Sequence, residues 1–360
     1  REGAVALGME TPGVAELYAE LRAARAMLHV DAARLYSRMP TQNGVVMTAE
    51  NSGVVKIDKV YPPATKFKRS TLQETYDYII KELEEAIPTM TTDKKLGGMN
   101  AWAAKLILAR AYLYTGQNDK AYTTAVDVIS NSPYDLFTYS NYVDAWRAEG
   151  SDDFIFEIST SDNTANSPQR NSLGYYTNPT GYAEVGVNDN AAFTNNVKGA
   201  FDALDDNDIR KQSISLRSNA GANEGYYTIK YMGRDGTTIY SSNPRPARLA
   251  EAYLIASEAA VKGGSTQANA DKYYNDLRRE RYAPGTYTDA ANVTLDDILD
   301  ERRVELFCEN HRLFDLVRNN KPVVRYDAAE TYQPDNDLLV HPFPLRETDV
   351  NPDLKQNPGY

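Results

Sequence analysis

The sequence contains a single cysteine, Cys308, so no disulfide can form within the chain. It has no apolar run near the ~20 residues that a membrane-spanning helix requires. The first ten residues lack the basic and then apolar pattern of a signal peptide. We therefore expect either a cytosolic protein or a chain that begins after processing.

Runs of lysine and arginine are also missing, and the formal net charge is −11. This balance argues against a nucleic-acid partner, whose phosphates select basic surfaces. The three histidines, His29, His311 and His341, are far apart and show no zinc-ligand spacing. No nucleophile-elbow serine or phosphate-binding glycine loop is recognisable, and Cys308 is expected to be a buried, inert thiol. The sequence thus predicts no metal, no cofactor and no enzyme.

Tyrosine is the abundant residue, with 26 copies against 2 tryptophans and 9 phenylalanines. A tyrosine ring is apolar and its hydroxyl is polar, so it suits both half-buried helix packing and wet binding surfaces. The position of each tyrosine along the chain must decide between these two roles.

Helical periodicity dominates both ends of the chain. Apolar residues recur at helical spacing over 14–36. A capping box, formed by either Ser70 with Gln73 or Thr71 with Glu74, opens a second helix. Its expected buried stripe consists of Leu72, Tyr76, Ile79, Ile80, Leu83 and Ile87.

The clearest pattern lies between Ala101 and Pro133 and is close to a tetratricopeptide repeat, which is a helix–turn–helix of about 34 residues. Small alanines let the two helices approach, Gly116 permits the turn, and Pro133 stops the second helix. A weaker copy spans 248–281, and a last helix is expected over 294–318. The sequence therefore predicts a mostly α fold built on tetratricopeptide-like helical pairs.

Residues from about 134 to 246 lack helical period and are rich in Asn, Gly, Ser, Thr and Tyr. More than a hundred residues cannot form one loop in a compact domain, so we interpret them as an irregular, partly β subdomain inserted into the scaffold. Strands are expected at 154–158 and 226–231. The predicted organisation is thus 1–133 (N-terminal helical scaffold), 134–246 (insertion) and 247–360 (C-terminal scaffold).

Several blocks with a distinctive set of residues follow one another along the chain. The most specific block carries Glu301-Arg302-Arg303, Glu305-Leu306, Arg312 and Asp315-Leu316-Val317-Arg318. The others are 34–40, 68–86, 100–114, 230–231 with 245–259, and the ending 342–360. In this order the blocks resemble the SusD/RagB family of outer-membrane nutrient-binding lipoproteins. One departure is Glu309-Asn310-His311, where the family has Glu-Gly before the arginine; asparagine also tolerates a left-handed turn.

The resemblance implies a lipoprotein on the outer face of the cell outer membrane, anchored through an N-terminal lipid that this chain does not include. Such a protein caps a SusC-like TonB-dependent transporter and delivers oligosaccharides to it without covalent chemistry. Family members also carry a substantial segment before the first helix matched here, and this segment often supplies part of the ligand site.

Aromatic residues of the insertion are interleaved with amides and arginines. An aromatic ring can stack on the apolar face of a sugar, while amides and guanidinium groups bind hydroxyls. The alternative is that these rings form the small core of the insertion. Because the family places ligand sites on this face, we expect a glycan site at Tyr139, Tyr142, Trp146, Arg170, Tyr175, Tyr176, Asn178 and Tyr182.

Three other functions stay open: a peptide-binding member of the same family, a tetratricopeptide-type scaffold for protein partners, and a glycoside hydrolase. The acidic and basic residues of 296–305 stand three and four apart, which favours helix ion pairs over catalytic carboxylates. The run 205–208 resembles the start of a calcium loop but lacks the later glycine and bidentate glutamate.

Overall fold

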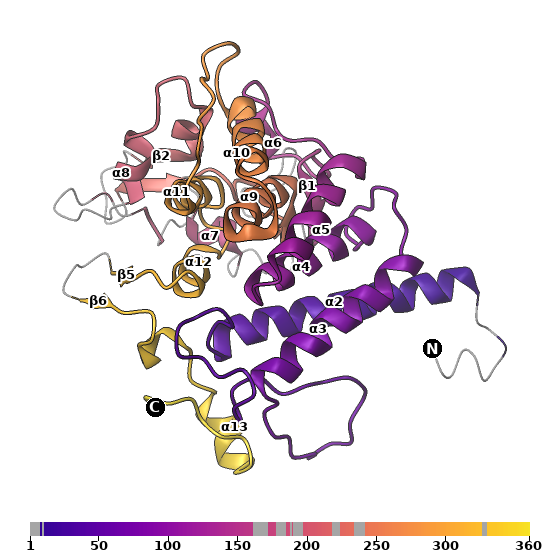
Figure 1. Ribbon diagram of the computed structural model, residues 1–360. Helices are drawn as coiled ribbons and strands as arrows, with labels where there is room; N and C mark the ends of the chain where they lie inside the picture. Colours follow the sequence, from indigo (N-terminus) through magenta and orange to yellow (C-terminus); the bar gives the residue numbers. More distant parts are fainter. Residues whose placement is uncertain are drawn as a thin grey trace.

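The computed structural model describes residues 8, 11–160, 172–177, 185–187, 189, 197–217, 224–233, 242–325 and 330–360. Helices form most of the regular structure in this described part, and its strands are short (Figure 1). The mostly α fold with helical pairs is therefore confirmed. Among these residues no helix combines the length and apolar character needed to cross a bilayer.

Eight helices make up the described scaffold. They are α2 (Pro12–Tyr36), α3 (Leu72–Ala86), α4 (Ala101–Tyr114), α5 (Asn118–Asn131), α9 (Leu249–Ala259), α10 (Gln267–Arg281), α11 (Leu295–Glu305) and α12 (Arg312–Arg318). The C-terminal segment adds β5 (Val323–Val324), β6 (Thr331–Tyr332), η5 (Asp337–Leu339) and α13 (Leu345–Val350).

The first helical layer consists of α2 and α3, which pack side by side (Figure 1). Of the two capping boxes that the sequence allowed for α3, the structure contains Thr71 with Glu74. The predicted stripe of α3 faces the core, because Leu72, Tyr76, Ile79 and Leu83 are fully buried and Ile80 and Ile87 are partly buried.

The two predicted repeat pairs are α4 with α5 and α9 with α10, and α5 packs on α9 to join them. Gly116 turns the chain between α4 and α5 at a φ of +74°, a conformation that favours glycine. Gly263 plays the same part before α10, at a φ of +92°. The buried alanines of α4, α5 and α9 let these helices approach closely, as the spacing predicted.

The last predicted helix is broken in two, contrary to the single helix expected over 294–318. α11 ends at Glu305, and Cys308 and Asn310 both have a φ of +61° before α12 begins. The left-handed role expected of Asn310 is therefore confirmed. Cys308 lies in this turn and is exposed, which corrects the expectation of a buried thiol within a helix.

The described part of the inserted segment contains only short elements, and its irregular, partly β character is confirmed. The described elements are α6 (Tyr142–Ala145), β1 (Phe154–Phe156), α7 (Leu173–Thr177), α8 (Val197–Asp202), η3 (Ile209–Ser213), β2 (Ile214–Arg217), β3 (Gly225–Thr228) and, at its end, β4 (Ala247–Arg248). β2 and β3 form an antiparallel pair, and β1 pairs with β4. The β1–β4 pair ties the insertion to α9. The division of the chain into the ranges 1–133, 134–246 and 247–360 stays a prediction.

Buried charges hold the insertion to the C-terminal helices. Glu305 is fully buried and accepts from Arg281, with 3.0 Å from Nε to Oε2 and 3.0 Å from Nη2 to Oε1. Arg248 Nη2 is 3.2 Å from its Oε1, and Arg210 Nη1 is 3.3 Å from its Oε2. Burial alone would raise the pKa of Glu305, but Arg281 and Arg248 hold it well below the usual range. Glu305 therefore stays ionised at the centre of three cations.

Candidate ligand-binding surface

Two of the predicted site residues, Tyr142 and Trp146, lie in a buried aromatic cluster. Both have no exposed surface, and Phe137 and Phe154 complete the cluster. The Trp146 ring centroid lies 6.0 Å from that of Phe137 and 5.4 Å from that of Phe154. A ring enclosed on both faces offers no platform for a sugar. The structure thus gives Tyr142 and Trp146 the packing role that the sequence left as the alternative.

Three cationic side chains surround Trp146. Lys230 Nζ lies 4.8 Å from its ring centroid, and the guanidinium carbons of Arg245 and Arg248 lie 5.4 and 5.0 Å away. These contacts stabilise a buried indole through the negative face of its ring. Arg245 also donates to the Trp146 carbonyl at 3.0 Å, which fixes the cluster to the end of the insertion just before β4.

Tyr175 and Tyr176, in contrast, remain half-buried on α7. Their rings meet edge to face with centroids 5.1 Å apart. The Tyr176 carbonyl accepts from the Val185 amide at 3.0 Å, which places Val185 next to α7, and both Val185 and Leu173 of α7 are exposed. We call Leu173, Tyr175, Tyr176 and Val185 the α7 patch. It presents two aromatic rings and two aliphatic side chains to solvent.

The remaining predicted residues are placed differently. Tyr139 is half-buried and packs against the buried aromatic cluster. Arg170, Asn178 and Tyr182 lie outside the described residues. The α7 patch is therefore the part of the predicted site that the structure brings together.

The β2–β3 pair extends this surface with residues that the sequence analysis did not select. The Val187 amide donates to the Tyr226 carbonyl at 2.7 Å, which links the strand to the chain just after Val185. Tyr226 is half-buried beneath Lys198, whose Nζ lies 4.8 Å from the ring centroid, and Leu216 opposite it is 51% exposed. A signal was present, because Tyr226 falls in a run of alternating β-prone residues, but we interpreted that run only as a strand.

The acidic cluster at 296–305 consists of partnered side chains, as predicted. Thr294 caps α11, and Asp297 accepts from the Thr294 amide to complete the capping box. Asp296 Oδ1 lies 2.5 Å from Lys321 Nζ. Glu301 pairs with Arg210 and, at 2.7 Å, with Arg278. Carboxylates held this way are poorly suited to exchange protons with a substrate.

The calcium-like run 205–208 uses its carboxylates internally. Asp205 accepts from the Asn207 amide at 2.8 Å, and Asp208 pairs with Arg210 at 2.7 Å. Across the described ranges no group of three or more His, Cys, Asp or Glu residues is arranged to hold a metal ion.

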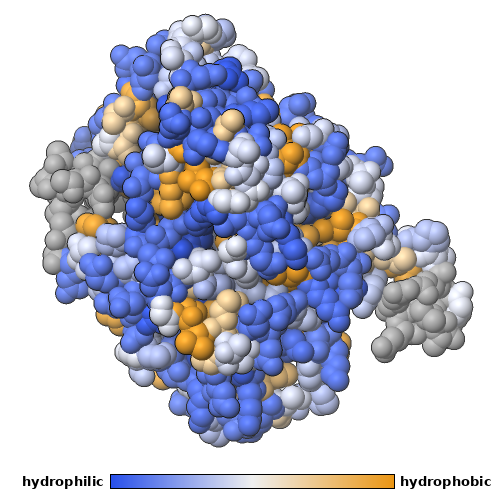
Figure 2. Space-filling view, viewed as in Figure 1, coloured by the Kyte–Doolittle hydropathy of each residue, from blue (hydrophilic) through white to orange (hydrophobic). Residues whose placement is uncertain are grey.

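Figure 2 shows that apolar residues on one face of the molecule form separate small patches within a hydrophilic surface. Paired helices of this kind, carrying an irregular insertion, define a tetratricopeptide-like helical protein. A model of the SusD family matches residues 97–360, which is most of the chain. The protein belongs to the SusD family.

Solved structures share the fold over nearly the whole chain. A SusD superfamily protein from Bacteroides vulgatus is 31% identical, with a TM-score of 0.85 over 99% of this chain and 81% of that one. A laminarin-binding SusD-like protein has a TM-score of 0.74 over 98% of this chain and 80% of its own, at 22% identity. The latter likeness concerns the fold alone.

A SusD-like protein of Bacteroides ovatus is 26% identical over 291 residues, which are 68% of this chain and 50% of that protein. The chain therefore spans about half the length of this curated relative.

Proposed function

We propose that the protein binds oligosaccharides at the cell surface, without catalysis, and passes them to a TonB-dependent outer-membrane transporter. Membership of the SusD family and the pair of accessible tyrosines on α7 carry this proposal together. The laminarin-binding structure with the same fold is consistent with a sugar ligand. The mature protein would be an outward-facing lipoprotein of the outer membrane, capping a SusC-like transporter.

The α7 patch is the proposed stacking surface. Edge-to-face packing fixes the Tyr175 and Tyr176 rings relative to each other, so little side-chain freedom is lost when a sugar stacks on them. The exposed aliphatic side chains, Leu173 and Val185, extend the apolar area beside the rings. Such contacts give modest affinity, which suits a protein that must release its ligand to a transporter.

Calorimetric titration of the full mature protein against a panel of neutral oligosaccharides, including laminarin fragments, tests the proposal. We expect one glycan class to bind saturably. Replacing both Tyr175 and Tyr176 by Ala should weaken that binding about thirtyfold, taking about 1 kcal/mol for each aromatic contact.

Tyr360→Ala is the matched control, because this tyrosine is 53% exposed and lies at the other end of the chain. It should leave the affinity unchanged. Binding to peptides alone would replace the glycan proposal with a peptide-capture role. Glycan binding that survives the double variant would remove the α7 patch from the site.

A further inference from the structure

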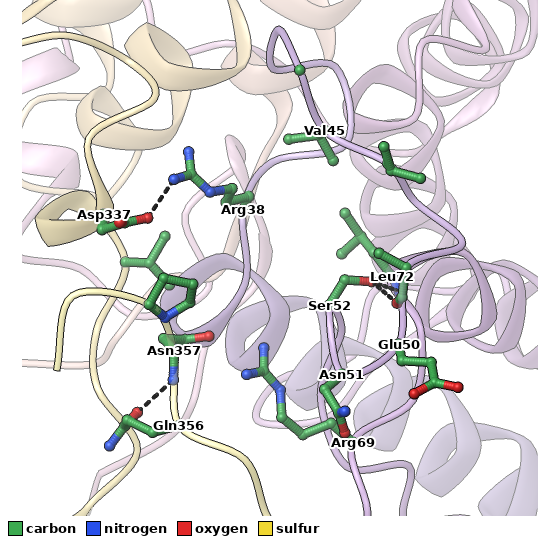
Figure 3. A pocket seen from close by; sticks show the side chains of 15 residues that line it. Arg38, Val45, Glu50, Asn51, Ser52, Arg69, Leu72, Asp337, Gln356 and Asn357 are labelled. Carbon is green, nitrogen blue, oxygen red and sulfur yellow. Dashed lines mark hydrogen bonds and ion pairs between the residues drawn. The ribbon is translucent and has the colours of Figure 1, made fainter.

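A cavity of about 420 Å³ lies between the loop that follows α2 and the C-terminal segment, remote in sequence from the insertion. Its apolar wall includes Val45, Val46 and Leu72 (Figure 3). Polar side chains, among them Asn357 and Arg69, also line the space. The α7 patch contributes nothing to this cavity.

Arg69 is one of the charged residues that line the cavity, and it is only 8% exposed. Its Nε donates to the Gly53 carbonyl at 2.9 Å, and Nη1 and Nη2 donate to the carbonyls of Lys355 and Tyr36 at 3.2 and 3.3 Å. The guanidinium also stacks on Phe343, with 4.8 Å from its carbon to the ring centroid. A guanidinium has further N–H groups beyond these, so donors remain for a ligand.

No carboxylate neutralises Arg69. Its three partners are neutral carbonyls, and no described acidic residue lies within ion-pair distance. Burial without a counter-charge lowers the pKa of Arg69 to about 10. Arg69 is thus a buried cation beside a cavity, without an anionic partner among the described residues.

The other charges around the cavity leave this imbalance in place. Arg38 and Asp337 neutralise each other at 2.5 Å. The exposed Glu50 carboxylate points away from Arg69 in Figure 3.

The cavity wall opposite Val45 is held in place by its own hydrogen bonds. Asn357 Nδ2 donates to the carbonyls of Tyr36 and His341 at 3.0 and 2.8 Å. Gln356 accepts from the Phe343 amide at 2.8 Å and donates to its carbonyl at 2.9 Å. A ligand would therefore meet a preorganised surface and lose little affinity to reordering.

We propose that this cavity binds a planar carboxylate, which accepts from the remaining N–H groups of Arg69 while the rest of the ligand covers Val45, Val46 and Leu72. Guanidinium and carboxylate match in shape, and hydrogen bonds between charged partners are stronger than neutral ones. The carboxylate can belong to an acidic sugar residue or to a peptide end. The proposal concerns a second site and does not rest on glycan binding at the α7 patch.

The test titrates the full mature protein, at constant ionic strength, with sodium glucuronate, glucose and N-acetylglycine. Two variants leave the Arg69 contacts intact. Val46→Trp places a large ring in the cavity from a side chain that is 62% exposed. Glu50→Gln removes the negative charge at the rim.

We expect glucuronate to bind and glucose not to bind. Val46→Trp should abolish glucuronate binding, and Glu50→Gln should tighten it about two- to fivefold, because one repulsive charge is lost. If N-acetylglycine binds and glucuronate does not, and if both variants change N-acetylglycine binding in this way, the carboxylate site is supported and its carboxylate belongs to a peptide. Binding of neither acid, or binding that ignores both variants, would overturn the proposal. Neutral oligosaccharide binding to Val46→Trp, measured separately, reports on the α7 patch alone.

Discussion

Replacing Glu305 by Gln removes the negative charge at the centre of three buried arginines. Arg281, Arg248 and Arg210 would each lose a charged acceptor, although Asp153 still lies 2.7 Å from Arg248 and Asp208 lies 2.7 Å from Arg210. Removing one member of a buried ion pair costs about 3–5 kcal/mol, because the partner charge remains buried. Asp153 also lies 3.7 Å from Arg281, so the remaining acids moderate the loss for all three arginines and we expect about 3 kcal/mol, the lower end of this range.

That loss converts to a modest fall in the melting temperature. With an unfolding entropy of about 2.1 cal/mol/K per residue, 360 residues give about 0.75 kcal/mol/K, so Tm should fall by about 4 °C. Calorimetry and urea unfolding should agree on the loss. The matched control is Glu347→Gln, since Glu347 pairs with Arg346 on the surface and should contribute less than about 0.5 kcal/mol. A Glu305→Gln protein as stable as this control would refute the view that the buried charges join insertion and scaffold.

Three further outcomes are expected. Burial lowers the pKa of His311 to about 3, so below pH 6.5 the unfolded chain takes up a proton that the folded chain does not. About 2 kcal/mol of stability should therefore be lost between pH 7.5 and 5. Urea unfolding at the two pH values should show a smaller loss for His311→Gln. Trp146→Ala should lower the free energy of unfolding by about 3–5 kcal/mol, measured by thermal unfolding. Trp146→Phe should leave the glycan affinity unchanged. If a stable Trp146→Phe protein bound glycan more weakly, Trp146 would belong to the binding site. Asn310→Ala should destabilise the folded protein by about 1 kcal/mol, because the φ of +61° at this position is unfavourable for a side chain other than asparagine or aspartate. Asn310→Gly should not destabilise it, and equal melting temperatures of the two variants would contradict this prediction.

The helical pairs could be predicted because the responsible residues are local. Alanine spacing, Gly116 and Pro133 act within one pair, so the sequence alone indicates where the helices begin and turn. The break after Glu305 was not predicted, since a helical charge pattern continues through it. It depends on two left-handed residues, Cys308 and Asn310, of which only Asn310 has a side chain that favours this conformation.

The aromatic residues show why the candidate site was only partly predictable. Trp146 and Tyr176 look alike in the sequence, as aromatic residues among polar neighbours. Trp146 is buried because Phe137, Phe154 and distant cations such as Arg245 enclose it. No local pattern reports contacts across nearly a hundred residues, although the close spacing of Phe137 and Phe154 around it was a signal for a core.

The C-terminal segment has a consequence for the order of folding. Arg69 and Tyr36 bond Lys355 and Asn357 across sequence separations of 286 and 321 residues. A chain synthesised from its N-terminus can form α2 and α3 before residues 355–357 have been made, but the loop between these helices lacks its second wall until then. Contacts of such long range close slowly and expose partly formed structure in the meantime. The loop between α2 and α3 is therefore expected to become complete long after the two helices have formed, and a chain cut before residue 355 would leave this loop open on one side.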